Sequence, residues 1–215
     1  MPSIYPASPL RGPPPKGLYL ITPDEPDTVR LIARVEAVVD QATWLQYRNK
    51  GADAALKREQ LAALVPLCRQ FKLPLIVNDD AALAMEFQTD GVHLGEDDGN
   101  LRAARRLLGP QAIIGASCYD DLARARSAAE EGADYLAFGA FFPSATKPNA
   151  RRAAFELLRD SAGFRLPRVA IGGITPDNAR AVIAGGADLI AVISGVFDAA
   201  DPPAAARAYR ACFDP

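Results

Sequence analysis

The sequence predicts an α/β fold, a single (β/α)8 TIM barrel that follows a proline-rich N-terminal arm. Eight short apolar runs alternate with segments that carry the 3.6-residue periodicity of amphipathic helices. Each run is apolar at successive positions, which is typical of parallel strands that are buried on both faces. Two matching turns, Gly132-Ala133-Asp134 and Gly186-Ala187-Asp188, indicate repeated βα units. The predicted strands are Leu18–Ile21, Thr43–Gln46, Leu75–Val77, Gly91–Leu94, Ala112–Ala116, Tyr135–Phe138, Val169–Ile171 and Leu189–Ile193.

The domain boundaries follow from the prolines and from the chain length. Residues 1–16 hold six of the 18 prolines, and proline fixes φ and removes an amide donor, so we expect an extended or disordered arm. Residues 17–215 then form one compact barrel domain, since a typical barrel has about 250 residues. A helix is expected over Pro176–Ala184, with proline in its first turn and glycine after its end.

A doubly wound open sheet is the alternative fold. It is disfavoured because no GxGxxG motif follows the first apolar run and no GxxxxGK[ST] motif occurs in the chain. Pairing of the eighth strand with the first is the feature that distinguishes the two folds.

Composition excludes several classes of function. Lys and Arg total 24 against 26 Asp and Glu, a formal net charge of −2, so we expect no nucleic-acid partner. No apolar run approaches the roughly 18–20 residues that span a bilayer, so no membrane association is expected. Three distant cysteines without a CxxC pair favour a reducing, cytoplasmic location. The single histidine, His93, excludes a histidine-rich zinc site.

Polar residues follow the apolar runs, at the end of the barrel where ligands bind. Gln46, Arg48 and Lys50 alternate, so an extended segment places them on one face. A guanidinium and an ammonium there suit phosphate oxygens, and Lys147 follows the sixth run. Taken alone, this pattern is also that of a solvated strand end.

A metal site is predicted at two neighbouring strand ends. Asp79 and Asp98 follow the third and fourth runs, and two carboxylates suit Mg²⁺, which also takes substrate phosphates. Asp80 is interpreted as the N-cap of the next helix, which leaves Asp79 free for the metal.

A phosphate site is predicted after the last two strands. Gly172-Gly173 and Ile193-Ser194-Gly195 occupy the usual barrel phosphate position, where glycine lets backbone amides approach an anion. The alternative is two turns that need glycine.

The hydroxyl groups of Ser144 and Thr146 are expected to donate to a second anionic group. Ser117 is interpreted as a hydrogen-bond donor rather than a nucleophile, because the full GxSxG elbow is missing. His93 is expected to line the barrel behind the site, and Trp44 to lie in the core.

Taken together in their order along the chain, these motifs resemble those of the thiamine-phosphate synthase family, from about Gly17 to the end of the chain. The matching segments are Gly17–Thr22, Gln46–Lys50, Val77–Asp80, Asp90–Gly95, Gly115–Ser117, Ser144–Pro148, Ile171–Ile174 and Ile193–Ser194.

The resemblance implies an enzyme that joins a hydroxymethylpyrimidine diphosphate to a hydroxyethylthiazole monophosphate, giving thiamine monophosphate and diphosphate. By position it implies that Gln46, Arg48, Lys50, Asn78, Ser117 and Lys147 bind the pyrimidine diphosphate. Arg48, Lys50, Lys147 and Ser117 would be the catalytic residues among them. It also implies that Asp79 and Asp98 bind Mg²⁺. Ser144, Thr146, Gly173, Ile193 and Ser194 would bind the thiazole phosphate.

Three positions depart from the family pattern. Glu96 replaces a common glutamine, Ser144 a common threonine, and Tyr119 a histidine of many relatives. Two alternatives remain: a thiazole tautomerase, which resembles this family but relies on a histidine at the position of Tyr119, and a barrel that binds phosphates without catalysis. The expected partners are small-molecule substrates, and the pattern favours no particular oligomeric state.

Overall fold

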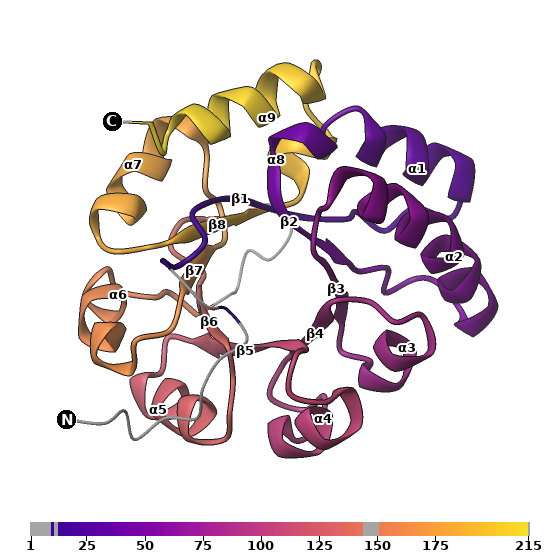
Figure 1. The fold of residues 1–215 in the computed structure, drawn as a ribbon. Coiled ribbons are helices and arrows are strands. Elements are labelled where there is room, and N and C mark those ends of the chain that lie inside the picture. The colour runs from indigo at the N-terminus through magenta and orange to yellow at the C-terminus, as the bar shows by residue number, and fades with distance from the viewer. Residues whose placement is uncertain (1–9, 11–12, 144–150, 215) are drawn as a thin grey trace.

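A computed structural model describes residue 10, residues 13–143 and residues 151–214. Its strands form a closed parallel barrel in sequence order, with β8 paired to β1, as Figure 1 shows. The predicted TIM barrel is therefore confirmed, and the doubly wound alternative is excluded. The strands are β1 (Gly17–Ile21), β2 (Ala42–Tyr47), β3 (Leu75–Asn78), β4 (Gly91–Leu94), β5 (Ile113–Tyr119), β6 (Tyr135–Gly139), β7 (Arg168–Ile171) and β8 (Leu189–Val192).

Helices surround the barrel (Figure 1). They are α1 (Thr28–Glu36), α2 (Ala54–Phe71), α3 (Ala81–Glu86), α4 (Leu101–Leu108), α5 (Leu122–Glu130), α6 (Glu156–Asp160), α7 (Pro176–Ala184), α8 (Ser194–Phe197) and α9 (Pro202–Ala211), with short 3₁₀ helices η1 (Val39–Gln41) and η2 (Ser161–Phe164). Helix α7 has the predicted bounds. Aspartate N-caps recur where loops enter helices, because a carboxylate oxygen accepts a hydrogen bond from an otherwise unpaired amide of the first turn.

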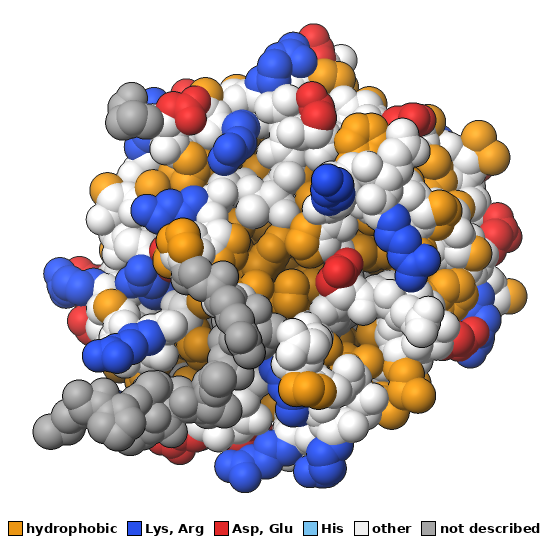
Figure 2. All heavy atoms as spheres, viewed as in Figure 1, with side chains coloured by type: hydrophobic (Ala, Val, Ile, Leu, Met, Phe, Trp, Pro, Cys, Tyr) orange, Lys and Arg blue, Asp and Glu red, His pale blue; other side chains and the backbone are white. Residues whose placement is uncertain are grey.

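Strand side chains alternate between two apolar clusters. On β1, Leu18 and Leu20 pack outward against the helices, whereas Tyr19 and Ile21 pack inside the barrel. The other strands follow the same two-residue period. Trp44 lies in the inner cluster, as predicted. Figure 2 shows hydrophobic side chains in the hollow at the centre of the ring.

Three aspartates join neighbouring strands at the point where β4, β6 and β8 begin, and two of them, Asp134 and Asp188, are buried. Asp90 accepts a hydrogen bond from the Leu75 amide at 2.8 Å, and Asp134 accepts one from the Ile114 amide at 2.7 Å. Asp188 accepts from the Arg168 amide at 2.9 Å. The two Gly-Ala-Asp turns thus have a physical reason: Asp134 and Asp188 each accept from a main-chain amide at the start of the preceding strand, which fixes the register.

Most of the predicted proline-rich arm lies outside the described residues. Within residues 1–16, Leu10 is described, and its side chain packs against the inner cluster of the barrel. Among the helices that the structure describes, none combines the length and the apolar character needed to cross a membrane.

Asp134 provides a test of the strand-joining carboxylates. Asp134→Ala should lower the free energy of unfolding by about 3 kcal/mol, because it leaves the Ile114 amide and the Arg105 guanidinium without their buried acceptor. Urea unfolding measures the change. Glu86→Ala is the matched control, since Glu86 pairs with Arg58 at the surface and should matter little. Equal destabilisation by both variants would contradict the assignment.

Candidate active site

A pocket of about 710 Å³ opens at the carboxyl ends of the strands. Its lining includes every predicted site residue that the structure describes. These are Gln46, Arg48, Lys50, Asn78, Asp79, Asp98, Ser117, Gly173, Ile193 and Ser194. The predicted residues Ser144, Thr146 and Lys147 lie outside the described residues.

The predicted alternation after β2 is confirmed. Gln46, Arg48 and Lys50 line the pocket, whereas the intervening side chains turn away toward α2. The Tyr47 hydroxyl donates to Gln60 Oε1 at 2.8 Å, and Asn49 Nδ2 donates to the same oxygen at 3.1 Å. One set of side chains thus faces the ligand space, and the other anchors the strand end to a helix.

Asp24, which the sequence analysis did not single out, holds the two basic residues. Its carboxylate accepts from Arg48 Nη1 at 2.9 Å and from the Lys50 amide at 2.8 Å. The Thr22 hydroxyl donates to the Arg48 carbonyl at 2.7 Å. The loop after β1 therefore fixes the cationic loop after β2, and the Lys50 side chain remains more than half exposed.

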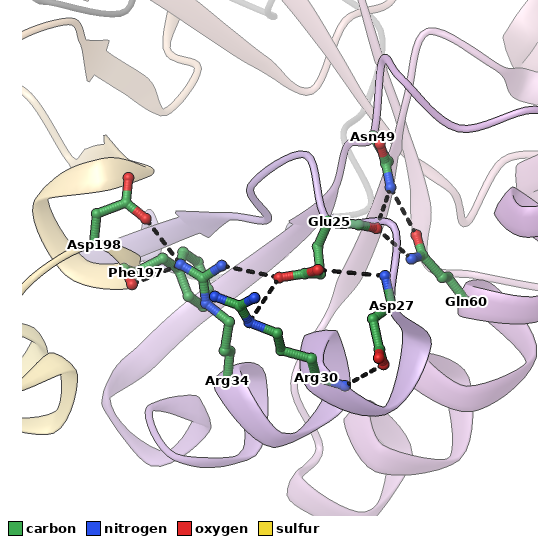
Figure 3. Close-up of polar contacts among 8 residues, drawn as sticks. All are labelled: Glu25, Asp27, Arg30, Arg34, Asn49, Gln60, Phe197 and Asp198. Carbon is green, nitrogen blue, oxygen red and sulfur yellow. Dashed lines mark hydrogen bonds and ion pairs between the residues drawn. The ribbon is translucent and has the colours of Figure 1, made fainter.

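Glu25 connects this loop to the opposite side of the site (Figure 3). Its carboxylate is only 4% exposed and pairs with Arg34 at 3.3 Å. Arg34 also donates to the Phe197 carbonyl at 2.6 Å, at the end of α8. The main-chain oxygen of Glu25 accepts from Asn49 and from Gln60, each at 2.7 Å. Glu25, through Arg34, thus links α8 to the loop that carries Arg48 and Lys50.

Asp79 and Asp98 face each other at the ends of β3 and β4. Burial and the neighbouring Asp98 carboxyl raise the pKa of Asp79 to about 6, and the Lys50 ammonium, 3.9 Å away, opposes this rise. Asp98 Oδ2 accepts from the Gly95 amide at 3.0 Å. Asp80 caps α3 through the Leu83 amide, as predicted.

This pair of carboxylates fits a hard cation. Two facing carboxyl groups repel when both are ionised, and Mg²⁺ is commonly held by one or two carboxylates together with water and substrate phosphates. Within residues 13–143 and 151–214, no group of three or more His, Cys, Asp or Glu side chains has metal-binding geometry. The two carboxylates therefore fit Mg²⁺ that is delivered with a phosphate ligand.

The glycine pair after β7 and the start of α8 form the other side of the pocket. Gly173 has φ of 64°, and a Cβ there would lie 2.2 Å from the Pro143 carbonyl oxygen and 2.7 Å from the Phe142 carbonyl carbon. Gly173 is therefore needed for close contact with the loop after β6, besides giving an anion room to approach. Ser194 begins α8 and is exposed to the pocket.

Beneath the mouth, a chain of hydrogen bonds crosses the barrel from Gln46 to Ser117. Gln46 Nε2 donates to the Tyr19 hydroxyl at 2.8 Å, which lies 2.8 Å from the Tyr135 hydroxyl. That hydroxyl lies 2.9 Å from His93 Nδ1, and His93 Nε2 lies 2.8 Å from Ser117 Oγ. The prediction that His93 lies behind the site is confirmed. The two tyrosines were not predicted, because both read as apolar strand residues.

Two further basic residues border the site. Arg124 Nε donates to the Ser117 carbonyl at 2.6 Å, and Arg151 lines the pocket. The guanidinium of Arg151 lies 6.0 Å from the centre of the Tyr119 ring. The sequence analysis did not find Arg124 and Arg151, because it considered the residues that directly follow strands, and these two lie in a helix and a loop.

His93 makes stability depend on pH. Burial lowers its pKa from 6.5 to about 4, against a smaller opposing effect of Asp98. His93 therefore binds a proton below about pH 6.5 in the unfolded chain but only below about pH 4 in the folded protein. The free energy of unfolding consequently falls as the pH falls from about 6.5 to about 4. His93→Gln should lack this loss, which is on the order of 2–3 kcal/mol. Urea unfolding at pH 7 and pH 4.5 measures it, and identical pH slopes for both proteins would contradict the assignment.

Comparison with known proteins identifies the family of this chain. Residues 18–196 match the family model described as thiamine monophosphate synthase. The chain is 60% identical over 198 residues to the thiamine-phosphate synthase of Xanthomonas campestris pv. campestris (strain 8004), covering 92% of this chain and 96% of that protein. It is 56% identical to that of Aromatoleum aromaticum, over 93% of this chain and 97% of the relative. The solved thiamine phosphate pyrophosphorylase of Pyrococcus furiosus superposes with a TM-score of 0.81 at 36% identity, covering 91% of this chain and 94% of that one. The chain belongs to the thiamine monophosphate synthase family.

Proposed function

We propose that the chain condenses 4-amino-2-methyl-5-hydroxymethylpyrimidine diphosphate with hydroxyethylthiazole phosphate, releasing thiamine monophosphate and diphosphate. The observation that carries the proposal is the pairing, within one pocket, of a cationic and carboxylate half with a glycine-rich half. Membership of the family supports the same reaction.

The pyrimidine diphosphate is assigned to the half formed by β2 to β5. Arg48 and Lys50 supply positive charge there, with Lys147 from the loop after β6 as a further predicted cation. Gln46 and Asn78 lie deeper on the same side and offer amide groups to the pyrimidine ring. Ser117 offers a hydroxyl from the end of β5.

The thiazole phosphate is assigned to the half formed by β7 and β8. Gly173, Ile193 and Ser194 line it, and the glycine leaves main-chain groups open to an anion. Ser144 and Thr146 are predicted to add hydroxyl donors.

The chemistry needs charge stabilisation rather than a general base. The bond between the pyrimidine methylene carbon and the diphosphate oxygen breaks, and its electron pair leaves with diphosphate. The lone pair of the thiazole nitrogen then forms the new carbon–nitrogen bond. No proton has to be removed from the nucleophile, so Arg48, Lys50 and Lys147 act by stabilising the leaving group and by positioning it.

Asp79 and Asp98 are the residues proposed to hold Mg²⁺. When bound, the ion would neutralise charge on the diphosphate. The proximity of the two carboxyl groups opposes ionisation of both, and a bound cation would favour it.

The other interpretations have less support. A tautomerase needs a proton-transferring group, and both ring nitrogens of His93 are engaged, one with the buried Tyr135 hydroxyl and one with the Ser117 hydroxyl. A barrel that only binds phosphates would not need a carboxylate pair beside the cations. The buried free thiols of Cys68, Cys118 and Cys212 support the proposed cytoplasmic location.

The proposed function is tested by mixing both substrates with Mg²⁺ and following diphosphate release and thiamine monophosphate formation. Formation of both products is the expected result. Turnover of either substrate alone, or none with both, would refute the proposal.

The metal assignment predicts a charge requirement at two positions. Asp79→Asn and Asp98→Asn should each raise the Mg²⁺ concentration needed for half-maximal rate, because asparagine keeps the size but not the charge of the ligand. A Mg²⁺ titration of initial rates measures this. Asp97→Asn is the matched control, because Asp97 is next to Asp98 in the sequence but is not among the residues that line the pocket. Unchanged titration curves for Asp79→Asn and Asp98→Asn would contradict the assignment.

The division of the pocket predicts selective defects. Ser194→Ala should raise the KM for the thiazole phosphate and leave that for the pyrimidine diphosphate nearly unchanged. Arg48→Ala should instead lower kcat by roughly 10²–10³, because its charge matters most as diphosphate departs. Saturation curves for each substrate measure both effects on variants whose melting temperature is checked first. The reverse pattern would overturn the division.

A further inference from the structure

The buried chain from Gln46 to Ser117 joins two residues that the proposed function places on the pyrimidine diphosphate. Between them lie Tyr19, Tyr135 and His93, which are at most 8% exposed. Burial raises the pKa of both tyrosines well above 10, so each keeps its hydroxyl proton. Burial of the His93 ring disfavours its charged form, so the ring carries one N–H, on one of its two nitrogens.

The protons of this chain have two arrangements. In the first, Tyr19 donates to Tyr135, Tyr135 donates to His93 Nδ1, and His93 Nε2–H donates to Ser117 Oγ. The Ser117 hydroxyl proton then points into the pocket. In the second, every bond reverses: Ser117 donates to His93 Nε2, Nδ1–H donates to Tyr135, and Tyr135 donates to Tyr19.

The two arrangements leave different protons without an acceptor. Gln46 already donates its amide to the Tyr19 oxygen, so in the second arrangement the Tyr19 proton has no acceptor among the described contacts. Tyr19 is 1% exposed, and an unpaired buried donor is costly. In the first arrangement the spare proton belongs to Ser117, which is half-buried and faces the pocket. The first arrangement is therefore favoured.

We propose that His93 is a positioning residue whose Nε2–H holds Ser117 as a hydrogen-bond donor toward the departing diphosphate. Tyr135 fixes the Nε2–H tautomer of His93 by donating to Nδ1. Gln46, on the far side of the barrel, fixes the donor-to-acceptor order of the hydrogen bonds by donating to Tyr19. The proposal rests on the proposed function for the identity of the ligand, whereas the proton arrangement rests on the burial and the hydrogen bonds of these five residues.

The barrel interior is shaped around this arrangement. Gly115 pairs with Tyr135 across β5 and β6, and a Cβ at Gly115 would lie 2.0 Å from the Tyr135 ring and 2.3 Å from its hydroxyl oxygen. The absent side chain thus gives Tyr135 the room to cross the barrel. The rings of His93 and Tyr135 stack at 5.5 Å with an interplanar angle of 21°.

The direct test uses the fact that His93 is the only histidine in the chain. Imidazole ¹⁵N NMR of the tag-free protein at pH 7 reports which nitrogen carries the proton, with no overlapping signal. The expected result is the Nε2–H tautomer in the wild-type protein, and a mixture of tautomers in Tyr135→Phe. Tyr47→Phe removes a similarly buried hydroxyl that is not part of the hydrogen-bonded series from Gln46 to Ser117, so it should leave the His93 tautomer unchanged. A proton on Nδ1 in the wild-type protein would overturn the proposal.

A double-mutant cycle tests the link to turnover. Tyr135→Phe alone should lower kcat several-fold, and Ser117→Ala should lower it by roughly 10²-fold. If Tyr135 and His93 act through Ser117, Tyr135→Phe should cause no further loss in the Ser117→Ala background. Independent effects that multiply, or an unchanged kcat in Tyr135→Phe, would refute the positioning role.

The two tests separate this proposal from the proposed function. If wild-type protein turns over both substrates but the tautomer or the cycle fails, the positioning role is wrong and the function stands. If wild-type protein releases no diphosphate, the function is wrong. The positioning role toward diphosphate then falls with it, while the tautomer spectrum still decides the proton arrangement.

Discussion

Pairing of β1 with β8 closes the barrel, and the geometry of the site depends on this closure. Gly17–Leu20 pair in parallel with Leu189–Val192, so the last strand returns to the first. The loop after β1, which carries Asp24 and Glu25, then lies between the cationic loop after β2 and helix α8. An open sheet would leave these segments at opposite edges, and the pair of Glu25 and Arg34 could not bridge them as it does here.

The two-residue period of the strands divides the barrel interior into an apolar floor and a polar mouth. Trp44 and Ile76 lie inside near the strand starts, and Gln46 and Asn78 follow two residues later on the same face. Water is excluded below, so hydrogen bonds there have fixed partners and directions. The groups proposed to meet substrate are therefore held by a rigid layer instead of by the loops alone.

The sequence predicted the features that depend on local pattern. Eight apolar runs, the Pro176–Ala184 helix, the Asp80 cap and the rim residues all follow from short-range rules. What it missed depends on distance: Tyr19 and Tyr135 are 116 residues apart, and Asp24 and Arg48 are 24 apart. A tyrosine in an apolar strand gives no sign that its hydroxyl meets another across a barrel. The roles assigned to Ser144, Thr146 and Lys147 stay predictions.

The central claim is that one mouth holds two phosphate groups in separate halves, with a divalent cation in only one of them. A crystal structure with diphosphate and Mn²⁺ in place of Mg²⁺ tests this most directly, because the anomalous signal locates the metal independently of the phosphate density. The account predicts a metal peak between Asp79 and Asp98, with the diphosphate beside Arg48 and Lys50. Diphosphate bound at Gly173 and Ser194, with no metal peak at the two carboxylates, would contradict it.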